Sequence, residues 1–258
     1  MSEDHVLLER QGPVARITLD RPEARNALTI AMYERLEAIC HELAQAPDLR
    51  VVTLRGAGGK AFAAGTDIAH FQDFTSGEDG IAYEERIDRC IGAIARLPLP
   101  TLAIVDGYAV GGGLAIAAAC DLRIATPDAS FGIPVAQTLG NCLSAASHAR
   151  LVAGFGVART KRILLLSQMI GAEEALQAGF LVEIAAPEAI DARASTIVET
   201  LRTAAPITLA VTKEALERLA QANLPEIDDL VRRTYGSEDF REGVAAFMAR
   251  RKPVWRGR

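Results

Sequence analysis

The sequence lacks the cysteine and histidine patterns that mark disulfide-stapled or metal-binding proteins. Its four cysteines lie far apart in 258 residues without a CxxC pair, and its four histidines form no HxxxH or HExxH motif. Wide, irregular cysteine spacing is typical of reduced thiols in a cytoplasmic protein, whereas metal sites need clustered ligands. We therefore expect a cytoplasmic protein without a metal site.

An excess of basic residues and a long apolar run are also missing. The net charge is −5, which disfavours nucleic acid as a partner. The most apolar stretch, residues 102–120, is interrupted by Asp106 and by the glycines at 111–113, so we expect no membrane span. The first five residues (MSEDH) are acidic, and we expect neither a secretory signal nor a transit peptide.

A serine-hydrolase motif and a dinucleotide-binding motif are absent as well. No GxSxG sequence is present, so a serine hydrolase is disfavoured. No GxGxxG sequence opens a helix, so a dinucleotide site is disfavoured too. Half of the residues are hydrophobic and 24% are charged, which is typical of a globular enzyme.

Short strands and helices alternate in the first half of the chain. Strands are predicted at four places, 14–19, 51–54, 102–105 and 121–125. Helices are predicted between Thr29 and Pro47, over 81–96, and from the glycine run onward. This alternation predicts an α/β core with right-handed crossovers.

The pattern becomes mainly helical after about residue 143. Glycines 154, 156, 171 and 179 and Pro206 are expected to interrupt it, with a short strand at 180–184. The tail is predicted to be an amphipathic helix from Ser237 to Pro253. We predict a core domain over residues 1–200 and a helical region over residues 201–258.

The glycine run Gly111–Gly113 joins a predicted strand to an alanine-rich helix. Glycine lets a ligand approach the backbone, and N–H groups in the first turn of a helix have no intrahelical acceptor. Such a turn can stabilise an oxyanion, or the glycines can simply permit tight packing of strand and helix. A second segment rich in small residues, 56–68 (GAGGKAFAAGTDI), follows the strand at 51–54, and by itself it is more typical of a flexible hairpin-like loop than of a site.

Together these segments resemble the crotonase superfamily, also called the enoyl-CoA hydratase/isomerase family. The resemblance spans nearly the whole chain and rests on several segments in the same order. They are residues 20–28 (DRPEARNAL), 60–68 (KAFAAGTDI), 106–113 (DGYAVGGG), 120–124 (CDLRI), 172–181, 242–247 (EGVAAF) and 250–253 (RRKP). It implies a spiral of ββα units with a C-terminal helical region that forms a homotrimer or hexamer.

The resemblance also implies an oxyanion hole for a coenzyme A thioester. The two backbone N–H donors map to Thr66 and Gly112. Each such donor typically contributes on the order of 3–4 kcal/mol to an enolate-like transition state. Coenzyme A would enter as part of the substrate, and no permanently bound cofactor is implied.

Further residues match positions that contact coenzyme A in the family. They are Glu23, Ala24, Arg25, Ala64, Asp67, Ile68, Phe247 and Arg250. Arg25 would meet a phosphate or form a surface salt bridge. Phe247 and Arg250 would reach the ligand of a neighbouring subunit, or Phe247 would only pack its amphipathic helix.

The two glutamates that hydratases of this family use are replaced. The matching positions hold Ala115 and Val135, neither of which can transfer a proton. Family members with other activities carry a polar residue on the helix before the GGG strand, which maps to Asp88, with Glu84 one turn earlier. Asp88 is the leading acid/base candidate and Glu84 the second, unless both are solvated surface acids.

The segment after Val135 departs from the family pattern, reading TLGNCLSAASH over residues 138–148. Asn141, Cys142 and Ser144 either line a pocket or serve as helix caps and core, and His148 is expected on a helix surface. We expect an acyl-CoA enzyme, a lyase or isomerase, with little conventional hydratase activity. Alternatives are decarboxylation, thioester hydrolysis, or acyl-CoA binding without catalysis.

Overall fold

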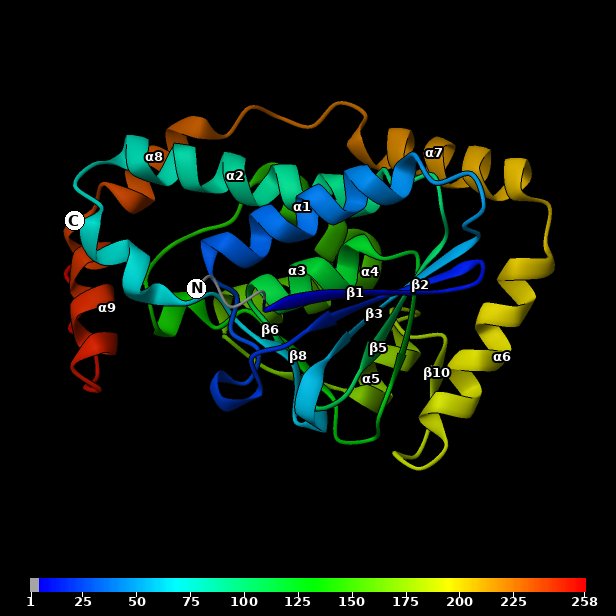
Figure 1. Cartoon of the computed structure of the whole chain (residues 1–258). Helices are drawn as coiled ribbons and strands as arrows, with labels where there is room; N and C mark the ends of the chain where they lie inside the picture. The colour runs from blue at the N-terminus through cyan, green and yellow to red at the C-terminus, as the bar shows by residue number, and fades with distance from the viewer. Residues whose placement is uncertain (1–4) are drawn as a thin grey trace.

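The computed structural model describes residues 5–258 and contains two β-sheets (Figure 1). The larger sheet has six strands in the order β1-β2-β3-β5-β7-β10. Their bounds are β1 (Val6–Gln11), β2 (Val14–Leu19), β3 (Val51–Gly56), β5 (Thr101–Val105), β7 (Leu122–Ala125) and β10 (Glu183–Ile184). Strands β1 and β2 are antiparallel, and the remaining pairs are parallel. In register, Val52 lies between Ala15 and Thr101.

The smaller sheet has four strands in the order β4-β6-β8-β9. They are β4 (Ala61–Ala64), β6 (Tyr108–Val110), β8 (Ser130–Gly132) and β9 (Ile170–Gly171). The helices are α1 (Ile30–Ala44), α2 (Gly77–Ala95), α3 (Gly112–Ala119), α4 (Ala145–Leu165), α5 (Ala172–Gln177), α6 (Ile190–Thr203), α7 (Pro206–Gln221), α8 (Asp228–Tyr235) and α9 (Glu238–Met248). The chain thus repeats one unit, β3-β4-α2, β5-β6-α3 and β7-β8-α4, which confirms the predicted spiral of ββα units.

The large sheet is covered on both faces. Ala103 and Val105 of β5 belong to the main core, with residues of α1, α2 and α3. Leu102 and Ile104 of the same strand belong to a second cluster that includes Ala194 of α6. Side chains alternate along a strand, so one short apolar strand serves both layers. Figure 1 shows α1 and α2 above the sheet and α6 beside it.

The boundaries of two helices follow from their first turns. As predicted, Thr29 caps α1, since its hydroxyl accepts a hydrogen bond from the N–H of Met32 at 3.2 Å. Helix α2 begins at Gly77 rather than at residue 81. The reason is a capping interaction in which Asp79 accepts from the N–H of Ser76 at 2.8 Å.

Two predicted helix ends were wrong. Gly154 stays inside α4, where the Phe180 ring occupies the space of a side chain, while Gly156 leaves helical geometry at φ 72°. Helix α9 ends at Met248 and does not reach Pro253. Arg250 takes a left-handed conformation at φ 51°, and Arg251 turns back to Glu242.

The C-terminal helices return to the core. Tyr235 of α8 packs its ring on Gly80 of α2, where an added Cβ would lie 2.2 Å from the ring. Figure 1 shows α8 beside one end of α2 and α7 at the far end of the molecule. None of the helices within residues 5–258 is long and apolar enough to cross a membrane.

Candidate active site

Two backbone segments meet at the edge of the small sheet. The first is the end of β4 with Gly65 and Thr66, and the second is the start of α3. A Cβ added to Gly111 would lie 3.5 Å from the Cα of Gly65, and one added to Gly113 would lie 2.2 Å from the carbonyl oxygen of Ala63. Gly111 also has a positive φ of 53°. The glycine run therefore permits both the turn and the close contact with β4.

The segment 61–64 is a buried strand rather than a flexible loop. It pairs in parallel with β6, and Ala64 at its end donates its N–H to the carbonyl of Arg25 at 3.0 Å. Asp67 donates to the carbonyl of Leu28 at 2.8 Å. These bonds hold the intervening Gly65–Thr66 peptide in place. The small residues allow β4 to pair with β6 while α3 packs closely against it. Their composition alone does not reveal this role.

Thr66 and Gly112 lie close to each other. An added Cβ at Gly112 would be 3.0 Å from the Thr66 hydroxyl oxygen. Gly112 is the first residue of α3, where an N–H has no intrahelical acceptor and the helix dipole is positive. Among the described residues, no group accepts a hydrogen bond from the Thr66 N–H. Both residues line one pocket.

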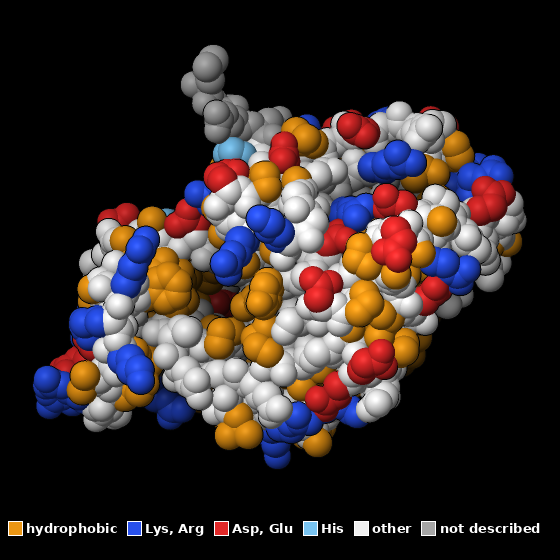
Figure 2. All heavy atoms as spheres, turned by 90° about the horizontal axis from the view of Figure 1, so that it is seen from below, with side chains coloured by type: hydrophobic (Ala, Val, Ile, Leu, Met, Phe, Trp, Pro, Cys, Tyr) orange, Lys and Arg blue, Asp and Glu red, His pale blue; other side chains and the backbone are white. Residues whose placement is uncertain are grey.

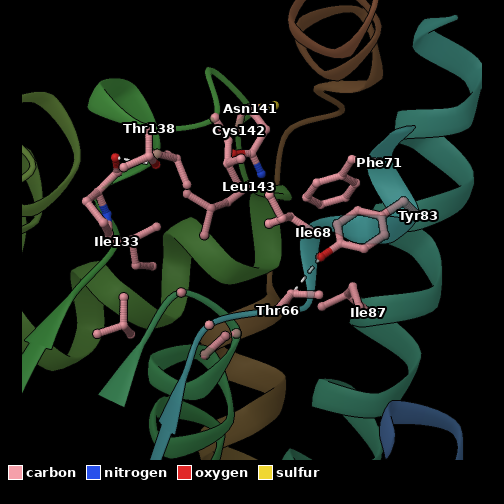
Figure 3. A pocket seen from close by; sticks show the side chains of 18 of the residues that line it. Thr66, Ile68, Phe71, Tyr83, Ile87, Ile133, Thr138, Asn141, Cys142 and Leu143 are labelled. Carbon is pink, nitrogen blue, oxygen red and sulfur yellow. Dashed lines mark hydrogen bonds between the residues drawn. The ribbon is translucent and has the colours of Figure 1, made fainter. Parts of the chain in front are cut away.

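The pocket has mainly apolar walls and a cavity volume of about 170 Å³. Figure 3 shows Ile68, Phe71 and Tyr83 on one side and Ile133, Thr138 and Leu143 on the other. Figure 2 shows a hollow on this face of the molecule with hydrophobic side chains at its rim. Ala115 and Val135 also line the pocket, so the walls are apolar at both positions where the hydratase glutamates map.

Glu84 is a carboxyl group in the pocket wall. It is buried on α2, and its two oxygens accept hydrogen bonds from the Tyr235 hydroxyl at 2.6 Å and the Ser144 N–H at 3.0 Å. Burial raises the pKa of Glu84 to about 8; the two donors oppose this rise, and the nearby Asp88 adds to it. At neutral pH Glu84 is therefore largely protonated.

Asp88 lies one turn further along α2 and faces a different space. It is not among the residues that line the pocket with Thr66 and Gly112. It lines an adjacent cleft with Glu84, Glu85 and Glu226. Its carboxylate accepts from the Ser144 hydroxyl at 2.8 Å, and its pKa is raised by burial. Of the two carboxyl candidates, only Glu84 lines the pocket with Thr66 and Gly112, because Asp88 lies one helical turn further along α2.

The segment 138–148 contributes to both the pocket and a helix cap. Asn141 and Cys142 line the pocket. Ser144 caps α4 instead, accepting from the N–H of Ser147 at 3.1 Å. His148 is half-buried on α4 and bonds the Ser144 carbonyl at 2.8 Å. Asn141 donates to the Tyr235 hydroxyl at 3.3 Å, so Asn141, Tyr235 and Glu84 form one connected group.

Three tyrosines at the site were missed by sequence reasoning. Tyr33 and Tyr83 line the pocket, and both hydroxyls contact the Thr66 hydroxyl. Tyr235 lies on the far C-terminal helix α8. Tyr33 shares the buried face of α1 with Leu36, so helical periodicity could have flagged it. Nothing in the sequence near Tyr235 indicates its contact with Glu84.

The residues matched to coenzyme A contacts divide into two groups. Ala64, Ile68 and Phe247 line the pocket. The loop with Glu23, Ala24 and Arg25 lies beside Ala64 at the outside, and Glu23 and Arg25 are exposed. Asp67 pairs with Arg21 at 3.0 Å, and Arg250 is exposed away from the lining.

Phe247 lies at the pocket of the single chain. Its side chain, on α9, lines the pocket of its own chain. Helix α9 packs on the 3₁₀ helix Ile68–Asp73, next to Thr66, and so places Phe247 at this pocket. The described chain therefore contributes Phe247 to its own pocket.

Comparison with known proteins gives consistent matches over the whole length. The family model described as enoyl-CoA hydratase/isomerase matches residues 9–258. The chain is 36% identical to (E)-benzylidenesuccinyl-CoA hydratase of Thauera aromatica, covering 98% of this chain and 99% of that protein. It is 30% identical to short-chain-enoyl-CoA hydratase of Clostridium acetobutylicum, covering 98% and 97%. Among solved structures, methylmalonyl-CoA decarboxylase in complex with 2-nitronate-propionyl-CoA superposes with a TM-score of 0.90 at 27% identity, covering 98% and 99%.

Proposed function

This chain belongs to the enoyl-CoA hydratase/isomerase family, and we propose that it stabilises the enolate of an acyl-coenzyme A thioester. The thioester oxygen accepts hydrogen bonds from the N–H groups of Thr66 and Gly112, and Glu84 transfers the proton. The observation that supports this proposal is that Thr66, Gly112 and Glu84, a buried carboxyl whose pKa is raised to about 8, line a single apolar pocket.

The two N–H groups act where negative charge develops. When an acyl thioester becomes an enolate, its carbonyl oxygen gains charge, and preorganised donors in a pocket with little water stabilise that charge strongly. The start of α3 adds the positive end of its dipole. The same pair serves several reactions that share an enolate, so it defines the class of substrate rather than the reaction.

Glu84 is suited to donate a proton at neutral pH. Its pKa of about 8 lies near the operating range, where general acids are most effective. The matched hydratase positions hold Ala115 and Val135, so a pair of carboxyls with divided roles is missing at the pocket. Conventional hydration of crotonyl-CoA is therefore expected to be far slower than in relatives that carry both glutamates.

Decarboxylation of a substrate such as methylmalonyl-CoA is the second candidate. The bond between the α-carbon and the carboxylate breaks, its electron pair becomes the enolate, and carbon dioxide leaves. Glu84 then gives its proton to the α-carbon and regains one from water. This reaction needs an acid but no base, which fits a single protonated carboxyl in an apolar pocket. The similarity to methylmalonyl-CoA decarboxylase favours the same reaction.

Coenzyme A is proposed to be part of the substrate and to lie along the outer side of β4. Arg25 is exposed on the loop beside Ala64 and can meet a phosphate. Main-chain groups of Glu23 and Ala24 and the Ala64–Ile68 segment would contact the adenosine and pantetheine parts. Phe247 would cover the acyl end of the pocket.

We propose a homotrimer or a hexamer of the chain. Helix α7 contains no buried residue in the single chain, although helices in proteins depend on a buried apolar face for stability. Ile207 and Leu219 on this helix are 78% and 73% exposed. A second copy would cover this surface.

The proposed function is tested with Glu84→Gln on purified protein. Turnover of crotonyl-CoA, methylmalonyl-CoA and saturated acyl-CoA thioesters is followed by chromatography of the coenzyme A products. We expect turnover of at least one substrate and a loss of roughly 100-fold or more in the variant, with acyl-CoA affinity retained.

Glu85→Gln is the matched control, since Glu85 is the exposed neighbour on the same helix. Equal turnover by Glu84→Gln and by the unmodified chain would remove Glu84 from the mechanism. Acyl-CoA binding without turnover of any of these substrates would favour the non-catalytic alternative, and release of free coenzyme A would favour thioester hydrolysis.

A further inference from the structure

Three hydroxyl groups gather beside the start of α3. The Tyr33 and Thr66 hydroxyls are hydrogen-bonded at 2.8 Å, and the Tyr83 hydroxyl donates to the Thr66 oxygen at 3.4 Å. The second of these bonds is the dashed line at Thr66 in Figure 3. All three residues line the pocket. We call this group the hydroxyl cluster.

The hydroxyl cluster has one more hydrogen than it uses. Three hydroxyls carry three hydrogens, and two hydrogen bonds join them. The Tyr83 hydroxyl donates its hydrogen to the Thr66 oxygen. Thr66 and Tyr33 share one bond, so whichever of them accepts keeps its own hydrogen. Within residues 5–258, no other group accepts from these hydroxyls, which leaves one donor unused in either arrangement.

The unused donor lies beside Gly112. A Cβ on Gly112 would stand 1.9 Å from the Tyr33 hydroxyl oxygen and 3.0 Å from that of Thr66. The hydroxyl of Thr66 also belongs to the residue whose N–H forms the other half of the hole. All of these residues line the same cavity. An oxygen bound between the two N–H groups is therefore within reach of the cluster.

Both tyrosines are buried, so the free hydroxyl hydrogen of the cluster can be donated only to an acceptor inside the pocket. Tyr33 is 1% and Tyr83 8% exposed, so neither side chain turns out to water. Burial raises the pKa of both phenols, so they keep their hydrogens throughout the neutral range. A buried O–H without an acceptor costs free energy, and this cost disappears when a ligand oxygen accepts it.

We propose that the hydroxyl cluster supplies a third donor, the Thr66 hydroxyl, to the thioester oxygen, while Tyr33 and Tyr83 both donate to the Thr66 oxygen. This inference rests on the proposed function, because it needs an acyl-CoA in the pocket. It assigns Thr66 two contributions, one from its backbone and one from its side chain. Any residue other than proline retains the first, whereas only serine or threonine retains the second.

The test measures the carbonyl directly. Acetyl-CoA labelled with ¹³C at its carbonyl is bound to the full chain, and the carbonyl stretching band is recorded by difference infrared spectroscopy. Each hydrogen bond lowers the frequency of this band. We expect the band of the unmodified protein to lie well below that of free acetyl-CoA. In Thr66→Val, which keeps the shape of the side chain, the band should move back toward the free value, and Thr66→Ser should restore the original band.

Kinetics give a second readout. For the substrate that the chain turns over, Thr66→Val is expected to lower kcat by roughly 100-fold with a small change in KM, since the donor acts mainly on the developing oxyanion. Thr66→Ala is the second variant if the valine methyl disturbs folding. Thr196→Ala is the matched control, because the side-chain hydroxyl of this exposed threonine on α6 donates only to the carbonyl of Ala192.

The outcomes separate this inference from the proposed function. A lowered carbonyl band that is identical in the unmodified protein, Thr66→Val and Thr66→Ala would overturn the third donor and leave the backbone hole in place. A band in the unmodified protein equal to that of free acetyl-CoA, or no binding, would overturn the proposed function itself.

Discussion

At the scale of single residues, the protonation of the carboxyl groups at the site depends on how deeply each is buried. Glu84 and Asp88 are one helical turn apart and bridged by Ser144, whose N–H bonds the first and whose hydroxyl bonds the second. Only Glu84 lines the pocket with Thr66. Burial makes Glu84 an acid that keeps its proton at neutral pH, which an exposed glutamate would not. Its hydrogen-bond partners then set how firmly the proton is held.

Tyr235→Phe tests this control of Glu84. The Tyr235 hydroxyl donates to the carboxyl and so favours its ionised form, lowering the pKa that burial has raised. Without that donor the pKa of Glu84 rises further. If the protonated form is the active one, the fall in kcat at high pH should move upward by roughly one pH unit.

The measurement is a pH–rate profile of the unmodified chain and the variant. Tyr108→Phe provides the control, since Tyr108 is 47% exposed and lies outside the pocket lining. An unchanged or downward-shifted limb in Tyr235→Phe would contradict the role assigned to its hydroxyl.

At the scale of elements, the contact between β4 and the start of α3 brings together the two residues of the proposed oxyanion hole, Thr66 and Gly112. Neither segment forms the proposed hole by itself, because the thioester oxygen is to accept one hydrogen bond from Thr66 and one from Gly112. Gly113 lies where the two elements are closest, and a Cβ there would meet the Ala63 carbonyl at 2.2 Å. The small residues at 61–64 and at 111–113 are therefore required for the same reason, because β4 and the start of α3 pack directly against each other.

Gly113→Ala is expected to separate these elements. Because a backbone carbonyl cannot turn aside as a side chain can, the added methyl should lower the free energy of unfolding by about 1–3 kcal/mol. Activity of the folded fraction should fall with it, since β4 must shift. Chemical denaturation measures the first effect and steady-state kinetics the second.

Gly171→Ala is the matched control, because no atom lies within 4 Å of its added Cβ and its φ of −77° suits alanine. Stability of Gly113→Ala equal to that of this control would contradict the close contact between β4 and α3.

At the scale of the whole molecule, the C-terminal helices have two tasks. Helices α8 and α9 return to the pocket and supply Tyr235 and Phe247. Helix α7 extends along the far end of the molecule without a buried residue (Figure 1). The predicted division into residues 1–200 and 201–258 stays a prediction, but the later segment does complete the site.

Leu219→Glu tests whether α7 is covered by other copies of the chain. A charge at a position that is 73% exposed in one chain costs little in a monomer but much in an apolar interface. We expect the unmodified chain to have the mass of a trimer or hexamer by light scattering and the variant to dissociate. Leu176→Glu on α5, at 37% exposure, is the control. A monomeric unmodified chain would refute the proposed assembly.

Much of the fold followed from the sequence because local patterns carry it. Strand residues at 51–54 and 102–105, the cap at Thr29 and the glycines at 111–113 each have a local physical cause, and all four were placed correctly. The start of α2 was missed because the periodicity of apolar residues begins after the cap. The strand at 61–64 was missed because its small residues match the space under α3, which becomes visible only when both segments are in place.

The sequence by itself determined the family and the two proposed N–H donors. The tertiary structure decided which carboxyl and hydroxyl groups surround them. Backbone N–H groups at Thr66 and Gly112 depend on turns and glycines that can be read along the sequence. The choice between Glu84 and Asp88, the hydroxyl cluster and the Tyr235 contact depend on burial and on partners up to 151 positions away. Proton affinity is set by such surroundings, and no local pattern encodes them.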